Sequence, residues 1–151
     1  MMARYLVVAN QTLGCDELVA RIDELRLEDP LAVTIAAPIT AREGEQQWDY
    51  PPTDRAIPDA ETIATWLAQD RLARELARLR ELGVDATGEV VESDPVDRVR
   101  EMLEQGRYDG VVVCTLPKRL SRWLLIDLPH RLHRATTVPV EHIPGSAGPS
   151  L

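Results

Sequence analysis

The chain has 151 residues and a formal net charge of −8 at pH 7, with 17 Lys and Arg against 25 Asp and Glu. The length predicts one domain with a substantial core, and the acidic balance argues against a general nucleic-acid binder, whose affinity comes largely from phosphate neutralisation. The sequence contains no apolar run of the roughly 18 residues that span a bilayer, and two cysteines are too few for a disulfide scaffold, so we expect a cytoplasmic protein without membrane association.

Strands and helices alternate from the first residues onward. Arg4–Ala9 is an apolar run ending at Asn10, as in a buried strand. From Asp16 the apolar residues recur at helical spacing, and Asp29-Pro30 ends that helix. Leu31–Ala37 is a second apolar strand, closed by Pro38. The first 38 residues therefore predict a strand, a helix and a strand.

A segment without periodicity separates these elements from a long helix. Residues 39–58 include Trp48 and Tyr50 and predict a long loop, either a flap over a pocket or a loop anchored by its aromatic residues on the rim of the sheet. An apolar stripe over about 59–82 predicts the helix. We interpret the charges of Arg71–Glu75 as its solvated face.

The second half continues the alternation. Asp94 is expected as the N-cap and Pro95 as the first residue of a helix ending at Gly106. A basic segment from Lys118 to Arg122 leads into a last helix ending near Arg134. The remaining expected elements are strands at Val84–Glu92, Asp109–Cys114 and Thr137–Ile143, followed by a disordered tail at 144–151.

This order predicts an α/β fold with three layers, α/β/α, around a five-stranded parallel sheet. The third strand alternates polar and apolar residues and the fifth contains Pro139, which favours edge positions for both. The expected strand order is therefore 3-2-1-4-5, within one domain over residues 1–143.

In this order a ligand crevice is expected where strands one and four end side by side. The basic segment flanks it and offers side chains for an anion, unless these residues simply face solvent. The candidate ligand-binding residues are Ala9, Asn10, Gln11, Thr12, Pro38, Thr115, Lys118, Arg119, Ser121, Arg122 and Asp127.

The chain resembles the universal stress protein family, within the wider group of HUP-type nucleotide-binding α/β domains. The resemblance lies in the first strand, Leu6-Val-Val-Ala followed by Asn10, where the family usually has Asp beside the nucleotide. It is clearest over 109–143, with Leu120-Ser-Arg, a helix containing His130-Arg-Leu-His-Arg, and Val138-Pro-Val. The resemblance implies this fold and a homodimer formed through the last strand, with Val138, Val140 and His142 at the dimer edge.

The family's ATP motif, Gly-x2-Gly-x9-Gly-Ser/Thr, does not match this chain. Its four positions hold Val113, Leu116, Ile126 and Asp127. Glycines in such a loop let phosphates approach the backbone, and an N-cap carboxylate at Asp127, with Pro129 in the first turn, would occupy and repel the phosphate position. We therefore predict that ATP is not bound in the family's usual way.

Catalytic and metal-binding signals are weak. The three histidines form no convincing zinc set, and a catalytic pair would need Ser121 or Cys114 beside an imidazole. We assign no catalytic or metal-binding residue. Cys15 and Cys114 should be neighbours, either as inert core thiols or as a redox pair.

Three functions follow in order of preference. The first is a non-enzymatic, universal-stress-protein-like module for binding or signalling. The second is a protein that binds AMP, ATP or another anion through Lys118, Arg119 and Arg122. The third is a small hydrolase or transferase at the same crevice. AMP and ATP are the candidate cofactors, and neither is assigned firmly.

Overall fold

The computed structural model describes residues 2–40, 59–116 and 124–149, the last range with side chains from 128 onward. The Trp48 and Tyr50 loop therefore lies outside the described residues. The strands are β1 (Ala3–Val8), β2 (Leu31–Pro38), β3 (Asp85–Val91), β4 (Gly110–Thr115) and β5 (Val140–Pro144). The helices are α1 (Asp16–Glu28), α3 (Ala60–Glu81), α4 (Val96–Gln105) and α5 (Leu124–Ala135).

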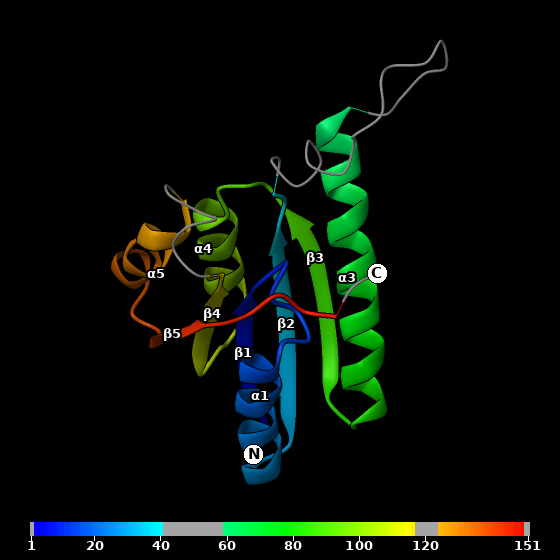
Figure 1. Cartoon of the computed structure of the whole chain (residues 1–151). Helices are drawn as coiled ribbons and strands as arrows, with labels where there is room; N and C mark the ends of the chain where they lie inside the picture. The colour runs from blue at the N-terminus through cyan, green and yellow to red at the C-terminus, as the bar shows by residue number, and fades with distance from the viewer. Residues whose placement is uncertain (1, 41–58, 117–123, 150–151) are drawn as a thin grey trace.

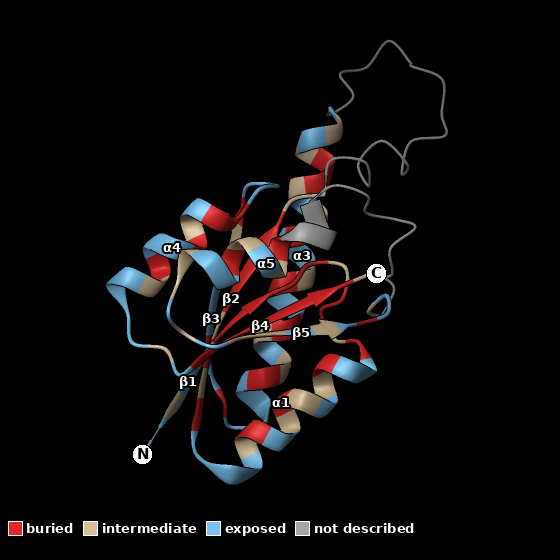
Figure 2. Ribbon diagram, turned by 90° about the vertical axis from the view of Figure 1, so that its left-hand side faces the viewer, coloured by how far each residue is buried: buried red, intermediate tan, exposed pale blue. Residues whose placement is uncertain are grey.

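The five strands form one parallel sheet in the order β3-β2-β1-β4-β5, as the sequence predicts. The alternation of side chains along each central strand supplies both covering layers. Val7 and Val112 face α1 and α3, whereas Val8 and Val113 face α4 and α5. The three-layer architecture is visible in Figures 1 and 2, where the central strands are buried on both faces.

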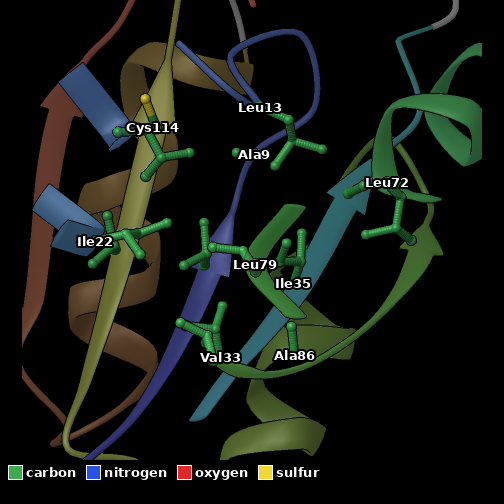
Figure 3. Packing of buried hydrophobic residues seen from close by; sticks show 14 of the residues in the cluster. Ala9, Leu13, Ile22, Val33, Ile35, Leu72, Leu79, Ala86 and Cys114 are labelled. Atoms are coloured by element: carbon green, nitrogen blue, oxygen red, sulfur yellow. The ribbon is translucent and has the colours of Figure 1, made fainter. Parts of the chain in front are cut away.

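The larger cluster lies between the sheet and helices α1 and α3. Its helical members include Leu18 and Ile22 of α1 and Leu72 and Leu79 of α3. Figure 3 shows these layers meeting, with Cys114 of β4 among the apolar side chains. The face with α4 and α5 holds the second cluster, around Val99 and Leu132. In the described part of the chain no helix is both long and apolar enough to cross a membrane.

Two element boundaries, the starts of α4 and β5, differ from the sequence prediction. Helix α4 begins at Val96, and Pro95 rather than Asp94 is its N-cap. The Asp94 carboxylate still accepts a hydrogen bond from the Val96 amide at 3.4 Å. Strand β5 begins at Val140, because pairing with β4 starts there and Pro139 precedes the strand, with its carbonyl accepting from the Val111 amide.

The prediction that the charged residues of Arg71–Glu75 face solvent is wrong in part. Glu75 is only 4% exposed and is paired with Arg78 on the following turn. Arg71 is half-buried and donates to Asn10. These side chains face the turn after β1, which the pattern of α3 alone does not reveal.

Candidate functional site

A small cavity lies at the carboxyl ends of β1, β2 and β4. It has a volume of about 40 Å³ between its described walls. Six of the residues predicted to bind ligand line it, together with Val8, Thr40, Cys114, Leu116 and Leu128. The six are Ala9, Asn10, Gln11, Thr12, Pro38 and Thr115. The parallel order brings them together because neighbouring parallel strands end at the same edge.

The other predicted positions contribute less to the described geometry. Lys118, Arg119, Ser121 and Arg122 lie outside the described residues. Helix α5 begins at Leu124, so Asp127 is its fourth residue and the predicted N-cap role is wrong. The repulsion argument built on that N-cap therefore loses its geometric basis.

The side chain of Asn10, which lines the crevice, is held by three hydrogen bonds. Its side-chain amide donates to the carbonyl of Pro38 at 2.6 Å and to Thr40 Oγ1 at 3.4 Å, and its oxygen accepts from Arg71 at 3.3 Å. The side chain is buried. A carboxylate at this position would lack the donor that the Pro38 carbonyl requires. The structure thus gives a physical reason for Asn10 and adds Arg71, which the sequence did not indicate.

The turn from β1 into α1 holds the second wall of the crevice. The Thr12 hydroxyl is buried and donates to the carbonyl of Cys114 at 2.9 Å, which joins this turn to β4. Backbone hydrogen bonds from Leu13 to Asn10 and from Cys15 to Thr12 close the turn. Gly14 adopts a φ of 80°, the left-handed conformation that glycine tolerates best. This segment is therefore a short hydrogen-bonded turn from β1 into α1.

A hydroxyl–imidazole pair joins the ends of β4 and β5. Thr115 Oγ1 and His142 Nε2 are 2.6 Å apart, and the Thr115 side chain is buried. Burial lowers the pKa of His142 from its usual 6.5, which favours the neutral ring. From the sequence, a catalytic pair would need Ser121 or Cys114 beside an imidazole. In the structure the hydroxyl beside the His142 ring is that of Thr115, which lies two residues after Val113, the register partner of His142. In the described part of the chain no carboxylate bonds to this ring, so the third member of a catalytic triad is missing there.

The C-terminal segment 145–149, for which the composition favours disorder, runs back across the turn after β1 (Figure 1). The Gly145 amide donates to the Thr115 carbonyl at 2.8 Å, and the Gly148 amide donates to Gln11 at 2.7 Å. A Cβ at Gly148 would lie 1.9 Å from the Leu13 carbonyl oxygen, so only glycine allows this approach. The segment thereby covers the turn between β1 and α1.

The positions that hold glycine in the family's ATP motif carry larger residues in the described part of this chain, so phosphates would not meet uncovered backbone there. Val113 is fully buried within β4 and packs against α5 and α4. Leu116 follows β4 and lines the crevice with its side chain. Ile126 falls inside helix α5. A phosphate seat built from backbone amides therefore has no counterpart at Val113 and Leu116.

Sequence comparison identifies no relative: no protein-family model matches the chain, and no curated protein is significantly similar to it. Solved structures are similar in fold. The structure of hypothetical protein MJ0577 has a TM-score of 0.61 and 12% identity, with 95% of this chain and 97% of that chain covered.

Two structures of named universal stress proteins are also similar. One is an Arabidopsis thaliana universal stress protein family protein with AMP bound, with a TM-score of 0.56, 12% identity and coverage of 96% of this chain and 93% of that chain. The other, from Archaeoglobus fulgidus, has a TM-score of 0.54 and 17% identity over 93% of each chain. The chain therefore has the fold seen in universal stress proteins.

Proposed function

We propose that this chain, built on the fold of the universal stress proteins, is a non-enzymatic binding or signalling module of the cytoplasm that does not hold ATP through the family's glycine loop. Fold alone does not assign a function, so the proposal rests on the crevice. The observation that carries it is a crevice lined by Asn10 and Thr115 at the switch point of the sheet, combined with bulky side chains, Val113 and Leu116, at positions of the glycine loop.

Val113 and Leu116 stand at two positions where the family's loop has glycine. A glycine loop binds phosphates because its backbone amides are uncovered. Here the side chain of Val113 is packed in the core, and Leu116 forms part of the crevice wall. A triphosphate at this edge would need side-chain donors in place of these amides.

The absence of catalysis is supported by the chemistry of the described residues. The Thr115–His142 pair has the hydroxyl and the base of a nucleophilic site, but no described carboxylate orients the ring. No described group of three or more His, Cys, Asp and Glu side chains is arranged to hold a metal ion. These features favour binding over hydrolysis or transfer.

A second candidate function is binding of AMP, ATP or another anion through Lys118, Arg119 and Arg122. It is favoured by the AMP bound to the Arabidopsis protein and by the six predicted residues that gather at the crevice. Side-chain cations would then replace the missing glycine loop.

Isothermal titration calorimetry with AMP and ATP, in the presence and absence of Mg²⁺, separates the two candidates. The leading proposal predicts no ATP binding at micromolar concentration. Binding that is abolished by Lys118→Ala supports the second candidate. Micromolar ATP binding that survives Lys118→Ala contradicts both accounts of the loop. Incubation with ATP should release no ADP or AMP, and catalytic release would contradict the non-enzymatic assignment.

We also propose a homodimer formed through β5, one of the two edge strands of the sheet. Unpaired edge strands favour association, and two copies related by a twofold axis would satisfy both edges. Val140 and His142 lie on this strand, whereas Val138 precedes it and packs with Val140 against the second cluster. Light scattering at micromolar concentration should give the mass of a dimer, and a monomer mass would refute the assignment.

A further inference from the structure

Two buried thiols face each other beneath the C-terminal segment. Cys15 precedes α1, Cys114 is the fifth residue of β4, and their sulfur atoms are 3.9 Å apart. Both are free thiols with 3% of their surface exposed. They are the two cysteines of the chain, so no other thiol competes for either partner.

The backbone holds both cysteines firmly. Cys15 is the N-cap residue of α1, and its amide donates to the Thr12 carbonyl at 3.0 Å. Cys114 lies in β4, which is paired on both sides by β1 and β5. The hydroxyl of Thr12 binds the carbonyl of Cys114, so a single hydrogen bond links the two segments that carry the thiols. In a disulfide the two sulfur atoms are roughly 2.05 Å apart. Because the backbone is held at both cysteines, the sulfur atoms would approach each other by movement of the two side chains more than of α1 and β4.

Gly145 covers the pair. A Cβ at this position would lie 2.6 Å from the sulfur of Cys114 and 3.1 Å from that of Cys15. A larger residue would push directly on both sulfurs. Glycine lets the backbone seal the thiols from solvent and leaves their mutual approach free.

We propose that Cys15 and Cys114 form a reversible intramolecular disulfide that fastens the β1–α1 turn to β4. The oxidant is a low-molecular-weight disulfide. One cysteine thiolate attacks it, forms a mixed disulfide and releases one small thiol; the second cysteine then displaces the other small thiol. The two cysteines lose two protons and two electrons, and the small disulfide is reduced to two thiols.

The disulfide would affect the shape of the crevice. Cys114 lines it, and the β1–α1 turn forms the facing wall, so the disulfide would fix the distance between the two walls. Burial raises the pKa of Cys114 to about 12, so little of its thiolate is present at neutral pH and the exchange is expected to be slow.

The test is equilibration of the reduced chain in a buffer of reduced and oxidised glutathione. After acid quenching, mass spectrometry measures the intramolecular disulfide, and peptide mapping locates it. One sample is oxidised in the native state. A second is refolded from urea into the same buffer, which gives the oxidant access to both thiols. A third is held in urea throughout, where random motion of the unfolded chain must bring together two cysteines that are 99 residues apart in sequence.

We expect the Cys15–Cys114 disulfide in the refolded chain, with a ratio of disulfide to dithiol at least about 100-fold higher than in urea. Cys15→Ser should leave a single thiol and no intramolecular disulfide. Gly145→Ala should change the ratio, whereas Ser146→Thr should not, because it keeps the hydroxyl that donates to Glu17 and adds only a methyl group at an exposed position. A refolded chain that stays dithiol or carries glutathione adducts, or a ratio no higher than in urea, overturns the proposal.

Discussion

Replacing Gly148 with Ala should loosen the C-terminal segment while the rest of the fold persists. The added Cβ would lie 1.9 Å from the Leu13 carbonyl oxygen, a separation that real Cβ atoms do not adopt. The obstacle is backbone within a hydrogen-bonded turn, so the segment must move away from it. That movement breaks the 2.7 Å hydrogen bond from the Gly148 amide to Gln11.

The expected magnitude follows from the hydrogen bond that this movement breaks. One backbone hydrogen bond contributes about 0.5–1.5 kcal/mol net. The φ of Gly148 is not positive, so the variant meets steric contact rather than torsional strain. We expect the free energy of unfolding to fall by about 1 kcal/mol. Since 1.4 kcal/mol is a tenfold change, opening of the segment should become about five-fold more frequent.

Thiol labelling measures this opening, because Gly145 of the same segment lies against both cysteine sulfurs. A small thiol reagent should label Gly148→Ala about five-fold faster than the unchanged chain under conditions where both remain folded. Ser146→Thr is the matched control, since it adds one methyl group at an exposed position of the same segment. Unchanged labelling of Gly148→Ala, or a loss above about 3 kcal/mol in urea denaturation, would refute the reasoning.

Three further substitutions test the crevice. Thr12→Val removes the hydroxyl that binds the end of β4 and should lower the free energy of unfolding by about 1 kcal/mol in urea; an unchanged midpoint would contradict this role. Asn10→Asp places a carboxylate against the Pro38 carbonyl and should cost about 1–3 kcal/mol at neutral pH, partly recovered in acid when the carboxyl group is protonated. His142→Gln should remove one component of acid destabilisation: because the folded-state pKa of His142 is lowered, its contribution is full above about pH 6.5 and is lost as the pH falls through the folded-state pKa. Parallel pH profiles of wild type and His142→Gln would rule out that linkage.

The strand order was predictable because the residues of each strand indicate its surroundings. Continuous apolar runs in β1, β2 and β4 require cover on both faces, and the polar alternation of β3 marks an edge. The crevice followed directly, since its position depends only on which strands end side by side. Asn10 and Thr115 were therefore found from the sequence.

Features that depend on contacts across the fold were not predictable in the same way. The start of β5 is set by where β4 offers a partner, whereas the apolar residues before Val140 look strand-like in any context. Glu75 is buried because the turn after β1 lies across from it, and its own helix gives no sign of this. Gly148 shows that a glycine suggesting disorder in sequence also permits a close backbone approach.

The most direct test of the central claim is the response of backbone amides to saturating ATP, followed by nuclear magnetic resonance. We predict that the amides from Val113 to Leu116 and those at the start of α5 keep their chemical shifts, because no phosphate is seated on them. Large shifts confined to those amides, and persisting in Lys118→Ala, would show a triphosphate bound along the backbone and would contradict the account.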